Sequence, residues 1–381
     1  MRVVRTVASA CILIVVLAAA WTARPVVHGL SFVIRAADMQ GAARRAADVD
    51  AQAVRERILT IQTTRGPLRG RMYEPLQSFD RALLLTSGLH PAGIDEPRLV
   101  ALARQLAGSG LGVFTPDIEE LSHFAVTPAI TDQIESAAVW LADHVGGQRG
   151  RRVGLMGISF SGGLSVVAAG RPSLRDRAAY VFSFGGHDSL PRVLRYLCTG
   201  VDGSEQRRPH DYGVAVILLG VAERAVPSAQ VEPLRAAVRR FLWASHLDRV
   251  DKAQADREFA SLRAVAATLP EPSATLLRDV NDRNVADLGP RLLPYIGFYG
   301  DAPSLSPDRS EKPSAPVFLL HGIEDNVVPA IESEYLARDL QSAAPTRLLL
   351  SSLISHAEAD QPVHTLDVLK LASFWGDVLA R

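Results

Sequence analysis

Short apolar runs alternate with stretches of helical periodicity from Arg57 to the carboxyl end of the chain, and this alternation constrains the fold most strongly. The first two runs read as a hairpin around Gly66-Pro67, and eight runs are expected to be strands: Ile58–Ile61, Leu68–Tyr73, Ala82–Thr86, Leu111–Phe114, Val153–Met156, Ala179–Phe184, Pro316–Leu320 and Arg347–Leu353. Five stretches between or after them are expected to be helices: Arg98–Leu106, Ala129–Val145, Leu164–Ala169, Ile331–Leu340 and Leu366–Leu379. Since parallel strands need helical crossovers, the pattern predicts an α/β fold with a mostly parallel sheet and helices on both faces.

One long segment interrupts the alternation. Between Cys198 and Ser314 the periodicity is helical and no strand is expected; four helices are predicted there, at Tyr212–Val226, Val231–His246, Ala253–Thr268 and Ser273–Asp279. An all-helical insertion between two sheet strands is typical of a cap over the carboxyl edge of the sheet. We therefore expect a domain over residues 57–381, with a helical cap at about 198–314 inserted before the penultimate strand.

The amino terminus carries an uncharged run from Val7 to Ala23, preceded by Arg2 and Arg5. As a helix it would extend roughly 25 Å, close to the ~30 Å hydrocarbon core of a bilayer. It is a signal peptide cleaved near Ala18-Ala19-Ala20, an uncleaved signal anchor or, as the least favoured alternative, a buried core helix, and the apolar continuation from Val26 to Ile34 favours the anchor. With either a signal peptide or an anchor, the rest of the chain is expected on the periplasmic or extracellular side of the membrane. Residues 1–34 are thus the expected anchor or signal peptide, and residues 35–56 a polar linker.

The overall charge excludes several classes of partner. Forty-one Lys and Arg residues balance forty-one Asp and Glu residues, which argues against nucleic-acid binding. Two cysteines are too few for a disulfide scaffold or a four-cysteine zinc site. No Walker loop, dinucleotide fingerprint or His-Glu-x-x-His motif occurs. We expect no cofactor and no metal, and the sequence does not determine the oligomeric state.

A candidate nucleophile follows the expected strand Val153–Met156. That strand leads into Gly157-x-Ser159-x-Ser161 and then into a helix, the sequence context of a nucleophile elbow. Such a turn needs small residues two positions before and after the serine, and the helix N-terminus offers N–H groups to an oxyanion. Ser161 fits a second register, but Ser159 is favoured because it stands two residues beyond the strand end.

Candidate acid and base residues follow the last two strands. Asp325 lies in His-Gly-x-x-Asp-x-x-Val-Pro after the penultimate strand, with Glu324 and Asp188 as alternative acids. His356 lies on the loop that leaves the last strand, whereas His364 is expected to enter the final helix, so His356 is favoured as the base. The resulting order of nucleophile, acid and base is that of α/β-hydrolases.

With these motifs, the chain from about Arg57 to Arg381 resembles the α/β-hydrolase superfamily near its serine-esterase and dienelactone-hydrolase-like branches. Ser87-Gly88-Leu89 is similar to the His-Gly-x oxyanion strand of that family, with Ser87 in place of the histidine. The resemblance implies an oxyanion hole formed by the backbone N–H groups of Leu89 and Phe160. A serine at position 159, where the dienelactone branch has cysteine, points to the esterase side.

The sequence therefore predicts an exported, membrane-anchored serine hydrolase that cleaves a small-molecule carboxylic ester through an acyl-enzyme. Ser159 would attack the carbonyl, His356 would take its proton and Asp325 would orient the imidazole. Acyl transfer and amide or thioester hydrolysis are alternative reactions of the same three residues. A catalytically silent, membrane-tethered binding protein is the alternative outside catalysis, because fold alone does not imply activity.

Overall fold

A computed structural model of the chain describes residues 23–145, 151–203, 205–354 and 365–381. Its centre is an eight-stranded sheet in the order β1-β2-β4-β3-β5-β6-β9-β10. The strands are Val54–Thr63, Gly66–Pro75, Ala82–Thr86, Gly112–Pro116, Val153–Ile158, Ala178–Phe184, Val317–Gly322 and Thr346–Ser351 for β1 to β6, β9 and β10. β2 pairs antiparallel with both β1 and β4, and the other neighbours pair parallel.

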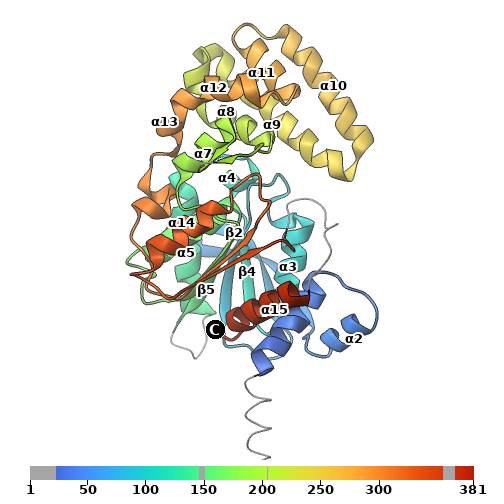
Figure 1. Cartoon of the computed structure of the whole chain (residues 1–381), viewed down its shortest axis with the longest axis vertical. Coiled ribbons are helices and arrows are strands. Elements are labelled where there is room, and N and C mark those ends of the chain that lie inside the picture. Colours follow the sequence, from blue (N-terminus) through green and yellow to red (C-terminus); the bar gives the residue numbers. More distant parts are fainter. Residues whose placement is uncertain (1–22, 146–150, 204, 355–364) are drawn as a thin grey trace, which may run out of the picture.

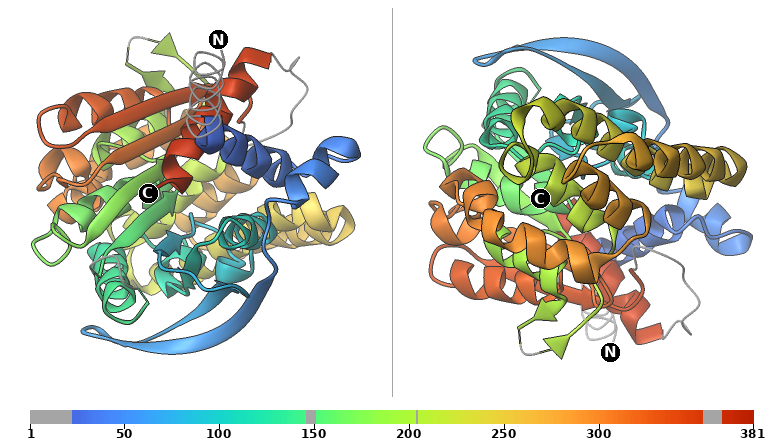
Figure 2. Two further views of the ribbon diagram at one scale, coloured as in Figure 1. Left: turned by 90° about the horizontal axis from the view of Figure 1, so that it is seen from below. Right: turned by 90° about the horizontal axis from the view of Figure 1, so that it is seen from above.

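Helices cover both faces of the sheet (Figures 1 and 2). Successive residues of a strand point to opposite faces, so each strand contributes to both layers. In β3, Leu84 joins one hydrophobic core, whereas Leu83 and Leu85 join the other. The first core is covered by α5 Pro128–His144, α6 Phe160–Gly170 and α14 Ile331–Leu340. The second is covered by α3 Pro97–Gly108 and α15 Thr365–Leu379. The fold is thus the α/β class expected from the sequence, with an α/β-hydrolase strand order.

A mostly helical cap enters between β6 and β9, before the penultimate strand, as expected. Its helices are α7 Leu190–Thr199, α8 Tyr212–Ala225, α9 Ser228–Val250, α10 Lys252–Thr268, α11 Ser273–Asn281, α12 Val285–Leu292 and α13 Ile296–Gly300. Two short antiparallel strands, β7 Val201–Asp202 and β8 Glu205–Gln206, depart from the all-helical expectation. Figure 1 shows the cap at one end of the sheet, and Figure 2 shows its helices crossing that end from above.

The segment just after the amino-terminal run belongs to the folded domain, which corrects the expectation that residues 1–34 form only an anchor or signal peptide. Residues 23–36 are helical and pack on α15. Phe32 is 1% exposed, and its ring centroid lies 4.3 Å from that of Trp375. The helices approach so closely at Gly29 that a Cβ there would lie 1.9 Å from the Ala372 carbonyl oxygen. The apolar stretch from Val26 to Ile34 is therefore explained by packing against α15.

Residues 35–56 are not a free linker either. Arg35 is 2% exposed, and its Nη2 donates to Ser109 Oγ at 2.9 Å. Residues Ala42–Asp48 form α2, where Ser31 Oγ donates to the carbonyl of the buried Ala47 at 2.9 Å. A polar composition suggested solvation, but small alanines allow close packing while the charged side chains pair at the surface. The folded domain therefore begins before Arg57.

The expected anchor run Val7–Ala23 lies, apart from its last residue, outside the described residues. In the ranges that the structure does describe, no helix combines the length and the apolar character needed to cross a bilayer.

Candidate active site

The turn after β5 holds Ser159 in a backbone conformation that L-residues rarely adopt. Its φ is +54° and its ψ is −127°, and it is the N-cap of α6. The backbone crowds on both sides, because a Cβ on Gly157 would lie 2.0 Å from the carbonyl oxygen of Ser161. The Ser159 N–H donates to the Phe184 carbonyl at 2.6 Å, which fixes the turn to the end of β6. The site of the expected nucleophile is thus a strained elbow between strand and helix.

The two serine registers have different surroundings. Ser161 is fully buried, and its Oγ donates to the Ser87 carbonyl at 2.5 Å. Ser159 is only half-buried and makes no such side-chain bond to its own helix. The geometry therefore gives Ser161 a structural contact between the elbow and the end of β3, and it suits Ser159 as the reactive group.

Both segments expected to form the oxyanion hole border Ser159. Phe160 is the first residue of α6, so its N–H has no acceptor within the helix. The loop after β3 passes close by, because a Cβ on Gly88 would lie 3.3 Å from Ser159 Cβ, and Leu89 follows it. Beneath the elbow the Phe160 ring stacks on the buried His187 at 4.6 Å. The Phe160 N–H and the segment that leads into Leu89 therefore both lie next to Ser159.

Asp325 is held on the loop that follows β9. It is 2% exposed, and its Oδ1 accepts hydrogen bonds from the N–H groups of Val327 at 2.8 Å and Val328 at 3.0 Å. His321 braces the same loop, because its Nε2 lies 2.9 Å from the Val328 carbonyl while Nδ1 lies 2.6 Å from Ser333 Oγ. The His-Gly-x-x-Asp-x-x-Val motif therefore builds a rigid turn around one carboxylate.

The end of β6 joins the elbow to this acid loop. Phe184 accepts the Ser159 N–H, and the next residue, Gly185, donates to the Leu320 carbonyl of β9 at 2.8 Å. A Cβ on Gly185 would lie 3.5 Å from Asp325 Oδ2. Gly185 has a φ of +64°, which glycine adopts without strain. Ser159 and Asp325 are thus brought to the two sides of one two-residue stretch.

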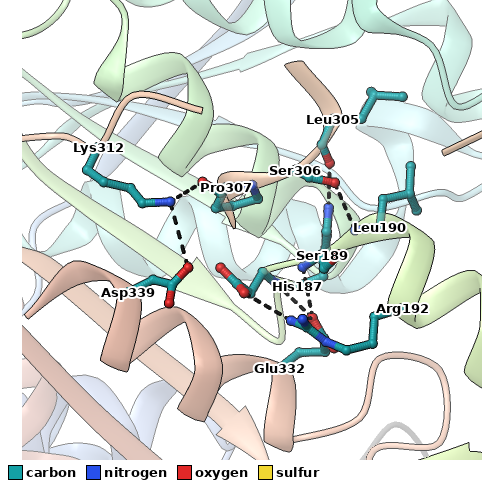
Figure 3. Close-up of polar contacts among 11 residues, drawn as sticks. His187, Ser189, Leu190, Arg192, Leu305, Ser306, Pro307, Lys312, Glu332 and Asp339 are labelled. Carbon is teal, nitrogen blue, oxygen red and sulfur yellow. Dashed lines mark hydrogen bonds and ion pairs between the residues drawn. The ribbon is translucent and has the colours of Figure 1, made fainter. Parts of the chain in front are cut away.

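The two alternative acids, Asp188 and Glu324, have different surroundings from Asp325. Asp188 is 2% exposed, and its Oδ2 accepts from Arg192 Nη2 at 2.9 Å. Arg192 also pairs with Glu332 in the polar network of Figure 3. Glu332 completes that network by accepting the N–H groups of Asp188 and Ser189, at 3.0 and 2.9 Å. Burial raises the pKa of Asp188 to about 6, opposed by the Arg192 guanidinium. Glu324 is a largely exposed residue, 3.9 Å from Arg207.

Both candidate bases, His356 and His364, lie outside the described residues. The structure describes the chain leaving β10 as far as Ile354. Ile354 packs on the end of β9, because a Cβ on Gly322 would lie 2.3 Å from its carbonyl oxygen. The chain that leaves the last strand therefore lies beside the loop that carries Asp325.

The cap adds groups that the sequence did not single out. Tyr212, the first residue of α8, lies close enough to Asp325 that burial first and then that carboxylate raise the pKa of its hydroxyl. His246 of α9 contacts His90, which follows Leu89, with ring centroids 4.7 Å apart. No motif marks these positions, since only the tertiary packing of the cap brings them to the sheet. Within the described ranges, no three His, Cys, Asp or Glu side chains gather as a metal site.

Comparisons with known proteins yield distant similarities. No protein-family model and no curated protein matches the chain. Among solved structures, a hyperthermophilic esterase from the archaeon Pyrobaculum calidifontis is 18% identical, with coverage of 85% of this chain and 81% of that one and a TM-score of 0.41. Dienelactone hydrolase from Anabaena variabilis is 17% identical, with coverages of 84% and 96% and a TM-score of 0.41. Acylaminoacyl peptidase from Pyrococcus horikoshii is 13% identical, with coverages of 81% and 39% and a TM-score of 0.43. We assign no residue role from them.

Proposed function

We propose that this chain is a serine hydrolase that cleaves a carboxylic ester. The observation that carries the proposal is the strained elbow at Ser159, tied through Phe184 and Gly185 to the buried carboxylate of Asp325. Strain of this kind persists only where the surrounding structure holds it, and it concentrates at functional sites. The fold alone would not support an activity, but the elbow, the acid loop and the oxyanion segments converge on one edge of the sheet.

In the proposed reaction, Ser159 Oγ attacks the ester carbonyl carbon while the base takes its proton. The N–H groups of Leu89 and Phe160 stabilise the tetrahedral oxyanion. The C–O bond to the alcohol then breaks, and the protonated base donates its proton to the leaving alkoxide. Water attacks the acyl-enzyme by the same sequence in reverse, which releases the acid and restores the serine.

His356 is the proposed base. It follows Ile354 by two residues, and Ile354 packs against Gly322 at the start of the acid loop. Asp325 Oδ1 accepts two backbone N–H groups, whereas Oδ2 lies 3.4 Å from His321 Nε2 and faces Gly185 at the end of β6. The proposed role of Asp325 is to hold the His356 imidazole in the tautomer that accepts a proton from serine.

The test uses the full chain, with a fluorophosphonate probe and a series of p-nitrophenyl esters of increasing acyl length. We expect labelling at Ser159 and turnover of at least one ester. Labelling without ester turnover would redirect the proposal to amide, thioester or acyl-transfer chemistry. Absence of labelling would favour a silent binding protein and contradict the proposal.

We further propose that the chain is exported and held at a membrane by residues 7–23. The support is the uncharged run with Arg2 and Arg5 before it. Figure 1 shows helix 23–36 beside α15, at the end of the molecule opposite the cap. A tether at this end would leave the candidate site directed away from the bilayer, toward esters that arrive from solution.

Localisation is tested on the native protein. We expect it to sediment with membranes, to resist a carbonate wash and to retain its original amino terminus. A soluble exported chain beginning near Trp21 would show cleavage and remove the membrane part of the proposal. Recovery of the full chain from the cytosol would contradict both parts.

A further inference from the structure

The sheet has two edge strands, β1 and β10, and they differ in character (Figure 2). An open edge exposes unpaired N–H and C=O groups, which proteins protect with charges, prolines or bulges. β1 carries such protection, because Arg55, Glu56 and Arg57 follow one another and are all exposed. β10 reads Thr-Arg-Leu-Leu-Leu-Ser, and its three leucines are only partly buried. Among the described residues β10 pairs with β9 alone, so it forms an open and largely apolar edge.

The hydrogen bonds between β9 and β10 fix which backbone groups of β10 face outward. The Pro345 carbonyl accepts the Val317 N–H at 2.8 Å, and the Ser351 carbonyl accepts the Ile323 N–H at 3.2 Å. Because backbone groups alternate in direction along a strand, the odd-numbered residues of β10 face β9. The residues that direct their N–H and C=O groups to the open edge are the even-numbered ones, Thr346, Leu348 and Leu350.

A groove of about 360 Å³ lies beside this edge, between β10 and α15. Its apolar lining includes Leu366 and Leu369 of α15, which are 70% and 45% exposed. The two cations of the groove each pair with a carboxylate of α15: Arg347 with Asp377, and Lys370 with Asp367. The described lining is therefore electrically balanced, and it offers apolar contact next to unpaired backbone groups.

We propose that β10 pairs antiparallel with β10 of a second copy of this chain, across a two-fold axis at Leu348. In this register Leu348 faces its own counterpart and Thr346 faces Leu350, so every outward N–H meets an outward C=O. Leu349 lies on the α15 side of the sheet and extends toward the groove of the other copy. Two copies of this balanced surface meet without repulsion between like charges, whereas a charged partner would find no opposite charge. The inference is independent of the proposed ester hydrolysis.

The test measures the mass of the full chain by analytical ultracentrifugation in a mild detergent, at micromolar protein concentration. We expect the wild type to be a dimer. Leu348→Pro should give a monomer, because proline lacks the outward N–H at the axis while the bonds from β10 to β9 remain. Leu369→Lys lies on α15, outside the strand, and should raise the dissociation constant roughly tenfold by placing an ammonium group in the apolar groove.

Ile58→Lys is the matched control, because Ile58 is 46% exposed on β1, the opposite edge of the sheet. It should leave the dimer unchanged, and thermal unfolding checks that each variant is folded. If Leu348→Pro does not fold, Leu369→Lys decides alone. A monomeric wild type would overturn the inference. A dimer that persists undiminished in the folded variants would also overturn it, because the copies would then associate elsewhere, as through the uncharged run Val7–Ala23.

Discussion

The elbow at Ser159 and the loop around Asp325 lie on the same edge of the sheet but are held in different ways. The elbow is held by the sheet itself: Gly157 makes room for the Ser161 carbonyl, Ser161 binds the end of β3, and the Ser159 N–H binds the end of β6. The acid loop depends on the cap. Its Asn326 carbonyl accepts the His210 N–H at 2.8 Å, and its Ile323 carbonyl accepts from Arg207 Nη1 at 2.9 Å.

The acid loop is therefore the part of the site that should respond to movement of the cap. A displaced cap would pull first on the loop of Asp325 through residues 207–210, while the elbow remains fixed by β5, β6 and α6. Mutations should therefore be able to disturb the position of Asp325 without disturbing the position of Ser159.

Ser159→Ala should abolish probe labelling and reduce kcat on the order of 10⁶-fold, because only binding and the oxyanion hole remain. Ser161→Ala is the matched control within the elbow; it should keep labelling and lose about 1 kcal/mol of unfolding free energy with its bond to Ser87. Active-site labelling and thermal unfolding measure the two. Loss of labelling in Ser161→Ala alone would reverse the register.

His356→Ala should reduce kcat by on the order of 10⁴-fold or more, since Ser159 loses its proton acceptor. His364→Ala should have a mild effect. Steady-state kinetics on one ester decides between them. Comparable losses in both variants would contradict the assignment of His356.

Asp325→Asn should lower kcat about 10⁴-fold by favouring the wrong imidazole tautomer, with the fold intact because the amide oxygen can still accept the Val327 N–H. The matched variant is Asp188→Asn, whose side chain lies in the Arg192 and Glu332 network (Figure 3) and should retain turnover. A kcat loss in Asp188→Asn equal to that of Asp325→Asn would make Asp188 the acid.

The raised pKa of Asp188 predicts that the free energy of unfolding depends on pH. Its pKa is raised to about 6, chiefly by burial, so the folded state holds the proton more tightly than the unfolded state. Its contribution is therefore favourable below about pH 4 and is lost as the pH rises to about 6, by about 3 kcal/mol at most. Denaturant unfolding should show this loss in the wild type and not in Asp188→Asn. Parallel pH profiles of the two proteins would exclude this origin.

Arg207→Gln should remove the hydrogen bond to the Ile323 carbonyl and so destabilise the acid loop without affecting the elbow. We expect kcat to fall by roughly two- to fivefold, from the loss of about 1 kcal/mol at the Ile323 carbonyl, with fluorophosphonate labelling still confined to Ser159. Arg208→Gln, one residue away and exposed, is the control and should be silent. Equal kcat in both variants would show that the cap does not position the acid.

The amino-acid sequence was sufficient to predict the alternation of strands and helices, the place of the cap and the local context of Ser159. These features follow from side-chain period and from small residues at fixed spacing, which act over a few residues. Its motif around Asp325 also marked a turn, and the structure explains the motif, because His321 and the Val327 and Val328 N–H groups brace that turn.

Which polar and apolar segments are buried could be seen only in the three-dimensional structure. Helix 23–36 resembled a continuation of the amino-terminal run, yet Phe32 packs on Trp375 because α15 offers a partner of matching shape. No motif marks Arg207, which binds the acid loop, and Asp188, an alternative acid by its place in the sequence, pairs with Arg192. Such contacts join residues more than a hundred positions apart in several cases, and no local pattern encodes their partners.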